Sequence, residues 1–531
     1  MAVIDAETLT PGQTLSCDIC IIGGGAAGIT VAHRLLKTGK KIILLESSAV
    51  DQRQNGADEQ REIVQQREST SAPESQAKLA AAGNPDGHRF LDPVTQRLYA
   101  GEQKQGLGRD YRFLERSRIR VYGGTTNCWG GWTRSLSPID FKRTDLLDEN
   151  LVWPIDAEEM EPHYRSAIRY CSLGDVAPSD YDNPQAWIGR TETPIAYAPQ
   201  KTGAVRTGVF TVMNGDTTGD HYDGALDFQL MWGKDFVQPT NITVVRNANA
   251  RYLESSAGRV TIAHAQTIRR PVGKPPEAGL TFRVSAKAYV VAAGGIETVR
   301  LLFLSKPGGL GNGAGHLGQN FMIHPLNENA GWVKLNEFPD RDKIRNLYTG
   351  WPKIKSNSIY APRIFAAFVP TDAAMKGAIG NYRMLVNFDS GGMNLNWEQT
   401  PNRESQITLG TKQDPIFKDP EVKLDFQMTK IEERTAHAAI NAVVDELIAL
   451  GYASDGSREP PQMDWPGDHH MGATRMSAAK KYGYVDPNCK SWEIDNLYIA
   501  SPSVFSTGGV SNPTLTIIAL ASRLADHLAR L

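Results

Sequence analysis

The chain has 531 residues, 40% of them hydrophobic and 22% charged, and its formal net charge is −2. A near-neutral charge gives no electrostatic reason to expect a nucleic-acid partner, and apolar runs such as "TIIALA" are too short to span a membrane. The length exceeds one ordinary hydrophobic core, so we expect two large domains or interleaved lobes.

The N-terminal sequence and the number of cysteines indicate in which cellular compartment the protein is expected. Residues 1–12 have neither the basic start nor the apolar core of a secretory signal. Five cysteines are too few for a disulfide framework in a chain of this length. We therefore predict a reduced, cytoplasmic protein, while export on a signal-bearing partner stays open.

A strand, a glycine-rich turn, a helix and a second strand follow one another within residues 17–46. The turn fits G-x-G-x-x-G with Gly23, Gly25 and Gly28, which allow a tight turn, backbone approach to a pyrophosphate and helix–strand packing. Glu46 ends the second strand, where it can accept hydrogen bonds from a ribose diol. This order predicts a dinucleotide site at the helix N-terminus; a turn without a ligand is the alternative.

Residues 51–105 are polar and rich in Gln, Glu and Ala, with little that builds a core. This composition predicts a surface excursion, and a lid or an oligomerisation arm is the alternative. A homo-oligomer is therefore an open expectation.

Two later stretches favour FAD over NAD as the dinucleotide. Residues 286–305 read as a strand that runs into two glycines and a helix, and residues 496–531 as a strand, a loop and a long C-terminal helix. Asn512 followed by Pro513 is typical of a helix start, with Asn512 as the capping side chain. Flavoproteins with such a beginning commonly return to the cofactor late in the chain.

Seven blocks along nearly the whole chain resemble the glucose–methanol–choline (GMC) oxidoreductases. They are, in order, "IIGGGAAG", "RVYGGTTNCWGG", "WPIDAEEMEPHY", "VVAAGGIETVRLL", "LGQNFMIHP", "HHMGATRM" and "SVFSTGGVSNPTLTIIALA". The resemblance implies an α/β fold (α+β overall), in which a Rossmann-like FAD-binding domain interleaves with a substrate domain built on an antiparallel sheet with helices.

The resemblance also implies how the two domains share the chain. The FAD-binding domain takes three segments and the substrate domain two, namely 1–145, 236–325 and 461–531 for the first, and 146–235 and 326–460 for the second.

Two of the blocks resemble the pyranose 2-oxidase and glycoside 3-oxidase-like branch of the family. Asn512 stands where many relatives carry a second histidine, and "GGTTNCWGG" resembles the segment of those sugar enzymes. In several of them a histidine before the tryptophan is joined covalently to FAD. Here Cys128 precedes Trp129, so we expect non-covalent FAD.

The resemblance gives His469, three residues before Gly472, the role of catalytic base. A group with a pKa near neutrality suits removal of an alcohol proton while hydride passes to flavin N5. Asn512 can hold the same oxygen as charge develops on it. A metal site is not expected, because adjacent His469 and His470 cannot easily turn both side chains to one ion.

The sequence thus predicts an FAD-dependent oxidation of a CH–OH group, with a secondary hydroxyl of a sugar or glycoside as the expected substrate and O₂ or another compound as the electron acceptor. A non-sugar alcohol, aromatic or aliphatic, is the alternative; a non-redox lyase and a binding protein are more distant ones. Polar side chains in "EQTPNRES", Gln399 and Arg403 among them, are candidates for substrate binding, and a solvated loop is the alternative. The residues expected at the cofactor are Gly23, Gly25, Gly28, Glu46, Gly123, Gly124, Thr125, Asn127, Cys128, Trp129, Ala293, Gly294, His470, Ser501, Pro513 and Thr514.

Overall fold

The computed structural model describes most of the chain. The described residues are 3–48, 98, 101–103, 114, 117–127, 129–144, 151–213, 228, 232–236, 241–271, 274–355, 362–464 and 467–531. Most of the polar stretch 51–105 and its predicted excursion, lid or arm lie outside them, and so does Cys128.

The first sheet is mostly parallel and begins with the predicted glycine motif. Its strands lie in the order β1 (Val3–Asp5), β7 (Ile242–Arg246), β3 (Ile42–Leu45), β2 (Thr14–Ile22), β10 (Glu277–Val291), β9 (Arg259–Arg269) and β8 (Asn249–Ser256), and β18 (Leu497–Ile499) also pairs with β10. All of β3, "IILL", is buried, as expected of a parallel strand covered on both faces.

The register of this sheet decides where the loops meet. Val291 of β10 pairs with Ile22 of β2 on one side and with Ile499 of β18 on the other. These parallel strands therefore end at one edge of the sheet, where ligands of open α/β sheets bind. The turns after residues 22, 291 and 499 consequently meet there.

The second sheet is antiparallel. Its strands lie in the order β17 (Ala453–Gly456), β11 (Leu326–Leu335), β14 (Gly392–Trp397), β13 (Tyr382–Val386), β12 (Arg363–Pro370), β6 (Val205–Val212) and β5 (Trp132–Thr133). A smaller sheet holds β15 (Gln406–Gln413), β16 (Pro420–Asp425) and β4 (Gly101–Gln103).

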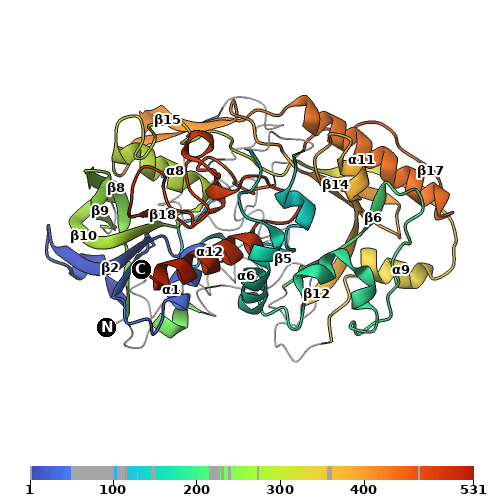
Figure 1. The fold of residues 1–531 in the computed structure, drawn as a ribbon, viewed down its shortest axis with the longest axis horizontal. Helices are drawn as coiled ribbons and strands as arrows, with labels where there is room; N and C mark the ends of the chain where they lie inside the picture. Colours follow the sequence, from blue (N-terminus) through green and yellow to red (C-terminus); the bar gives the residue numbers. More distant parts are fainter. Residues whose placement is uncertain are drawn as a thin grey trace.

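Helices cover and connect the sheets. Figure 1 shows the first sheet at one end of an elongated molecule and the second at the other, with α6 and α12 between them. α1 packs on α12, α12 on α6, and α11 on the second sheet. The α-helices are α1 (Ala26–Arg34), α6 (Ala157–Tyr170), α8 (Gly294–Ser305), α9 (Arg341–Tyr348), α10 (Asp372–Met375), α11 (Lys430–Ala449) and α12 (Thr514–Ala529). Short 3₁₀ turns are η1 (Ala6–Thr8), η3 (Gly124–Asn127), η4 (Pro138–Phe141), η6 (Pro178–Asp182), η7 (Pro184–Trp187), η8 (Gly233–Phe236), η9 (Lys480–Tyr482) and η10 (Pro502–Val504).

This architecture confirms the predicted fold class, a Rossmann-like unit interleaved with one built on an antiparallel sheet. The first sheet draws its strands from three separate stretches of the chain, as the second does from the stretches between them. The five exact segment boundaries stay a prediction. β5, which lies inside the first predicted segment, pairs with the second sheet.

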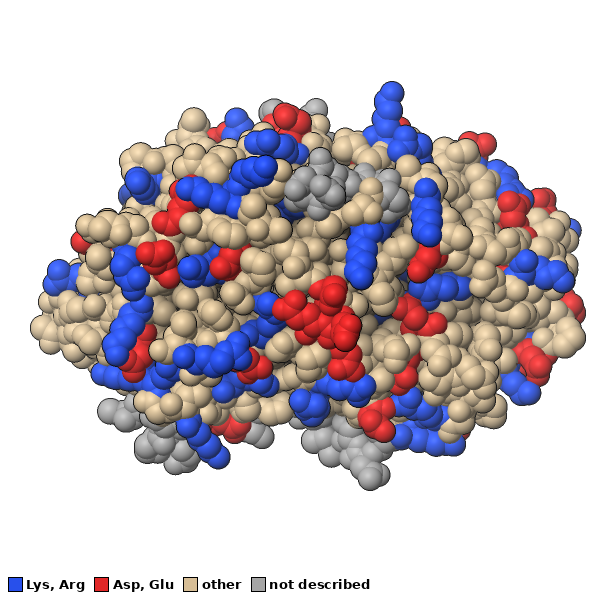
Figure 2. All heavy atoms as spheres, in the orientation of Figure 1, with Lys and Arg blue, Asp and Glu red and all other residues tan. Residues whose placement is uncertain are grey.

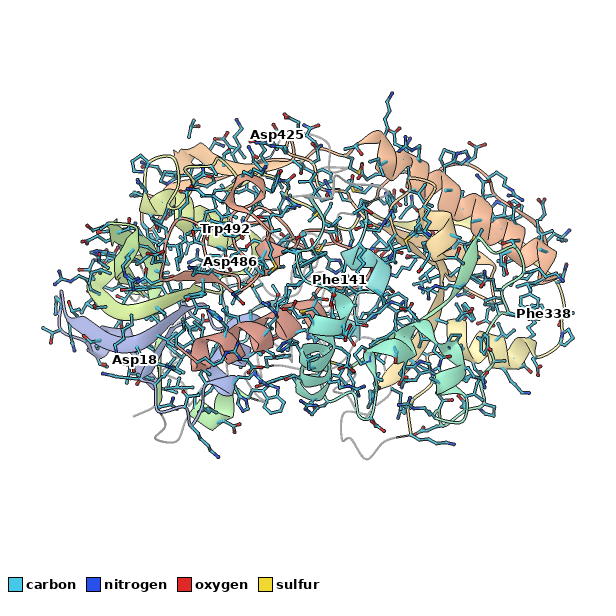
Figure 3. All side chains as sticks on the ribbon, in the orientation of Figure 1. Asp18, Phe141, Phe338, Asp425, Asp486 and Trp492 are labelled. Carbon is cyan, nitrogen blue, oxygen red and sulfur yellow. The ribbon has the colours of Figure 1, made fainter. Side chains whose placement is uncertain are left out.

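Buried aromatic side chains join the two halves of the molecule. Figure 3 shows Phe141 near the middle, and its ring lies 5.8 Å from that of Trp153, which in turn lies 5.4 Å from Phe505. The Trp153 indole donates a 2.8 Å hydrogen bond to Thr507 in the loop before α12. The loop that carries Asn512 is therefore anchored in a packed core.

The surface agrees with the near-neutral charge. Basic and acidic side chains are interspersed over the face shown in Figure 2. Among the helices of the described residues, each is too short or too polar to cross a membrane.

Candidate active site

The glycine motif forms the turn between β2 and α1. Gly23 has φ +110°, and a Cβ there would lie 2.5 Å from the Ala292 carbonyl oxygen. A Cβ on Gly28 would lie 1.9 Å from the Gly23 carbonyl oxygen. Both positions require glycine, because the turn packs against the end of β10 and the helix packs against the turn.

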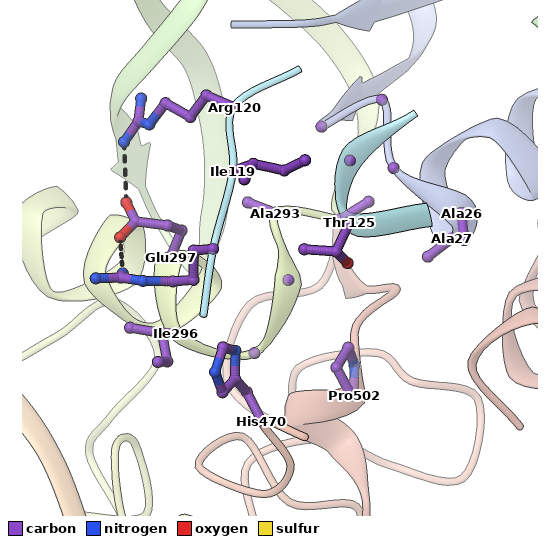
Figure 4. Close-up of a pocket in the computed structure, with 18 of the residues that line it drawn as sticks. Ala26, Ala27, Ile119, Arg120, Thr125, Ala293, Ile296, Glu297, His470 and Pro502 are labelled. Atoms are coloured by element: carbon purple, nitrogen blue, oxygen red, sulfur yellow. Dashed lines mark hydrogen bonds and ion pairs between the residues drawn. The ribbon is translucent and has the colours of Figure 1, made fainter. Parts of the chain in front are cut away.

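The N-terminus of α1 opens into a cavity. Gly25, its N-cap, has no side chain that could cap the helix, and Ala26 and Ala27 line the cavity (Figure 4). Free N–H groups and the positive end of the helix dipole favour an anion at this place. The geometry suits a pyrophosphate here.

Glu46 lies beside this turn with its carboxylate buried. One carboxylate oxygen accepts from the Gly24 N–H at 2.9 Å and the other from the Ser48 N–H at 2.7 Å. The same residue lines the cavity. It is fixed where the sequence places the acid that holds a ribose diol.

The "GGTTN" block lies directly against the glycine motif. Gly123 donates a 2.8 Å hydrogen bond to the Gly24 carbonyl and pairs with Gly25 as an isolated bridge. A Cβ on Gly124 would lie 3.0 Å from the Gly25 Cα. Two glycine-rich blocks that are about a hundred residues apart thus form one wall.

The cavity has a volume of about 480 Å³, within the range of roughly 300–1,000 Å³ usual for small-molecule and cofactor sites. It gathers most of the predicted site residues. Those that line it are Gly23, Gly25, Glu46, Gly124, Thr125, Trp129, Ala293, Gly294, His469, His470, Asn512, Pro513 and Thr514.

Other predicted cofactor residues support this wall from behind. Gly28 and Gly123 pack against the glycine turn, as described above. Ser501 donates a 2.9 Å hydrogen bond to the Gly294 carbonyl, while its neighbours Ala500 and Pro502 line the cavity. Asn127 ends η3, and Cys128 is outside the described residues.

An arginine cluster lines the cavity next to α8. Arg118, Arg120 and Arg300 surround Glu297, and the guanidinium nitrogens of Arg120 and Arg300 lie 3.1 Å and 3.6 Å from its carboxylate oxygen. Figure 4 shows Arg120 beside Glu297. Burial alone would raise the pKa of Glu297, but these guanidinium groups hold it below its ordinary value. Glu297 is therefore ionised, and the guanidinium groups around it favour an anionic ligand in the cavity.

His469 and Asn512 meet at the cavity surface. The Asn512 Nδ2 lies 3.2 Å from the His469 Nε2, and the His469 Nδ1 lies 2.8 Å from Nδ1 of the fully buried His324. Burial lowers the pKa of His469 well below its ordinary value, and His324, Arg383 and His470 lower it further. His469 is therefore a neutral imidazole at neutral pH, able to accept a proton.

Asn512 does not cap the following helix, contrary to the sequence prediction. The N-cap of α12 is Pro513, and the helix begins at Thr514. The Asn512 amide instead bonds to His469 and, through Oδ1, to Arg383. The side chain is committed to the site, so the positive end of α12 stays uncapped toward the cavity.

His470 lies on the cofactor side of the pair. It lines the cavity near Ile296 and Pro502 (Figure 4), and a Cβ on Gly295 would lie 2.4 Å from the His470 carbonyl oxygen. Burial, reinforced by Arg118, lowers the pKa of His470 to about 3. The two adjacent histidines thus face different surroundings.

The two candidate substrate residues lie outside the cavity lining. Gln399 is buried, accepts from the Ile323 N–H at 2.8 Å and donates to the Gln427 carbonyl at 3.0 Å. Arg403 is exposed and bonds to Gln319 at 3.0 Å. Their polarity serves local hydrogen bonds within the fold.

Sequence reasoning missed His324, Arg383 and Trp132. His324 lies in the block "LGQNFMIHP", and Arg383 interrupts an apolar strand, "YRMLV", which is a visible signal. Trp132 follows the "GGTTNCWGG" block and lines the cavity. The role of each residue is visible only from its contacts with segments that are distant in the sequence.

Part of the chain matches a known family, and several known proteins are similar to it. Residues 401–521 match the GMC oxidoreductase family model. Over 97% of this chain, 2-methyl-1,2-propanediol dehydrogenase of Mycolicibacterium austroafricanum is 25% identical and the fructose dehydrogenase large subunit of Gluconobacter japonicus 23% identical, covering 95% and 98% of those proteins. A C-glycoside 3-oxidase of Arthrobacter globiformis is 25% identical over 47% of this chain and 48% of its own.

A solved structure shares the fold. Pyridoxine 4-oxidase from Mesorbium loti superposes with a TM-score of 0.56 and 15% identity, covering 96% of this chain and 99% of that one.

The residues of the cavity fit FAD, the cofactor that this family implies. Uncapped N-termini of α1 and α12 open into the same cavity, which also holds the glycine turn, Glu46 and the arginine cluster. The N-terminus of α1 can bind the phosphates, and the N-terminus of α12 favours negative charge beside Asn512. The two helix ends therefore suit the pyrophosphate and the reduced flavin of FAD.

Proposed function

We propose that this chain is a GMC-type oxidoreductase acting on a CH–OH group, and that it oxidises a secondary hydroxyl of a sugar or glycoside to a carbonyl. The observation that carries the proposal is the contact between His469 and Asn512 in a cavity that also presents Trp129 and Trp132.

His469 and Asn512 have different roles in oxidation of the alcohol. When it is bound, FAD supplies the acceptor for the hydride that leaves the carbon. His469, neutral and with Nε2 beside Asn512, takes the hydroxyl proton. The Asn512 Nδ2 donates to the same oxygen as negative charge develops there.

Indole rings support a carbohydrate substrate. Trp129 and Trp132 are half-buried in the cavity wall, where a flat apolar ring can pack against the C–H face of a pyranose. Arg383 and Phe365 hold Trp132 from behind, with the Arg383 guanidinium 4.9 Å and the Phe365 ring 4.6 Å from its centroid. The relatives that act on fructose and C-glycosides add support.

A small aliphatic alcohol is the second candidate. It is favoured by the similarity to 2-methyl-1,2-propanediol dehydrogenase over nearly the whole chain. An anaerobic screen separates the two candidates, with loss of the visible flavin absorbance recorded for pyranoses, glycosides, diols and alkanols. We expect the fastest bleaching with a pyranose or glycoside; faster bleaching by a diol or alkanol than by every sugar would support the second candidate.

We also propose that FAD is held without a covalent bond, and predict that acid precipitation releases it. Cys128 stands where related sugar enzymes carry a linking histidine. Acid should leave a colourless pellet under a yellow supernatant. A yellow pellet, or a Cys128 peptide with the added mass of flavin, would show a covalent link instead.

A further inference from the structure

Arg383 is a buried arginine whose charge lacks a carboxylate partner within the described part of the chain. It lies on β13, 4% exposed, with its guanidinium 4.9 Å from the Trp132 ring and 5.3 Å from the Phe210 ring. Its hydrogen bond goes from Nη1 to the Asn512 Oδ1, and its buried Nε has no acceptor. By contrast, the neighbouring Arg134 pairs with Asp182.

The chemistry of these groups fixes the direction of each hydrogen bond. A guanidinium can only donate, so Asn512 must turn Oδ1 toward Arg383 and Nδ2 toward His469. The amide nitrogen also only donates, so the His469 Nε2 must be the acceptor. A neutral imidazole whose Nε2 accepts a hydrogen bond carries its proton on Nδ1.

His324 completes this arrangement on the other side of the ring. Its Nδ1 lies 2.8 Å from the His469 Nδ1, and the two rings meet edge to face with centroids 4.9 Å apart. Since the His469 Nδ1 carries the proton, the His324 Nδ1 accepts it. The His324 Nε2 then carries that ring's own proton, beside the backbone of Gly508.

We propose that Arg383 and His324 are positioning residues that hold His469 in the Nδ1–H tautomer, with the lone pair of Nε2 beside Asn512 at the cavity. Arg383 acts through the Asn512 amide, and His324 acts directly on the Nδ1 edge. The inference rests on the proposed function, in which Nε2 of His469 receives the alcohol proton. It adds the residues that make this nitrogen the acceptor.

The charges around His469 also favour its neutral form. The charged and titratable groups that face His469 are His324 from the loop before β11, Arg383 from β13 and the adjacent His470. Burial lowers the pKa of Arg383 to about 9, so it remains a cation at neutral pH. The nearby positive charge keeps His469 unprotonated in the resting enzyme, ready to act as a base.

The test uses the full-length holoenzyme labelled with ¹⁵N-histidine. The chemical shifts of both His469 ring nitrogens report which one carries the proton, and the signals are assigned by their loss in His469→Asn. Arg383→Met removes the donors and the charge at similar volume, and His324→Leu removes the acceptor. Arg383→Lys and His324→Asn are the conservative partners, since the first keeps a donor-only cation and the second an oxygen near the Nδ1 position.

Arg363→Met is the matched control. Arg363 begins the adjacent strand β12, donates to the Trp351 carbonyl at 3.1 Å, and has a bare buried Nε like Arg383. Its loss removes a comparable arginine from the same sheet without touching Asn512. It should change the melting temperature and leave the His469 tautomer and the rate of flavin reduction unchanged.

We expect wild-type His469 to show a protonated Nδ1 and a bare Nε2, and both Arg383→Met and His324→Leu to show mixed tautomers. The rate constant of anaerobic flavin reduction should fall roughly 10- to 100-fold in both, as on loss of a group that orients a functional histidine, with KM little changed. Arg383→Lys and His324→Asn should retain most of the wild-type rate constant. In Arg383→Met the acid limb of kcat/KM should also move to higher pH, because loss of the charge raises the pKa of His469.

A wild-type His469 that is protonated on Nε2 would overturn the proposal. So would a tautomer and a reduction rate unaltered by both Arg383→Met and His324→Leu. Failure of the proposed function is visible separately, since His469→Ala would then reduce flavin at the wild-type rate whatever the tautomer.

Discussion

We expect His469→Ala to slow anaerobic flavin reduction by the best substrate about 10²- to 10⁴-fold, the usual cost of losing a positioned base. The variant should still bind FAD, because the glycine turn, Glu46 and the arginine cluster stay intact. Stopped-flow measurement of the loss of flavin absorbance in the absence of oxygen isolates this step from re-oxidation. The remaining rate would reflect Asn512 and the bound substrate geometry.

Two matched histidine variants control this experiment. His437 is exposed on α11, and His437→Ala should behave as wild type. His470→Ala alters the cofactor side of the cavity and should affect FAD retention more than the reduction rate. If His470→Ala were crippled in reduction while His469→Ala were nearly normal, the base would be assigned to the wrong histidine.

Removing one hydroxyl from the substrate is the second large effect that we expect. A site built to hydrogen-bond a hydroxyl rejects an analogue that lacks it, by roughly 10⁴-fold in favourable cases, since buried polar groups are then left unpaired. The Asn512 Nδ2 and the His469 Nε2 lie 3.2 Å apart, so one substrate hydroxyl can contact both of them. Deoxygenation of the best pyranose or glycoside at the reacting carbon should therefore abolish flavin reduction.

A scan of monodeoxy sugars measures this effect position by position. Product analysis of the parent sugar identifies the oxidised carbon independently, and deoxygenation at a carbon remote from it is the matched control. Retention of wild-type kcat/KM by the analogue that lacks the oxidised hydroxyl would contradict the account. A small and equal loss of kcat/KM at every position would indicate that the sugar binds loosely and that no single hydroxyl is held for reaction.

The cofactor half of the site could be predicted from sequence because it is local. Strand, glycine turn, helix and acid follow one another within residues 17–46, so a motif alone specifies their geometry. The resemblance of short blocks predicts His469 and Asn512, because it relates positions along the chain. It does not predict which residues each of these side chains contacts.

The supporting residues depend on how distant segments pack. Arg383 reaches Asn512 only because β13 lies inside the second sheet, and the order of strands in an antiparallel sheet is not written in any one of them. The polarity of Gln399 and Arg403 predicts contact with substrate, yet polarity does not indicate which way a side chain points. In the fold the first bonds to Ile323 and Gln427, and the second to Gln319.

The account is tested most directly by mixing the purified protein anaerobically with its best sugar or glycoside, once with hydrogen and once with deuterium at the reacting carbon. We predict that the yellow colour is lost, more slowly with deuterium, and that the matching ketone forms in an amount equal to the flavin. A protein that stays yellow with every alcohol tested, or bleaches without forming a carbonyl product, would contradict it.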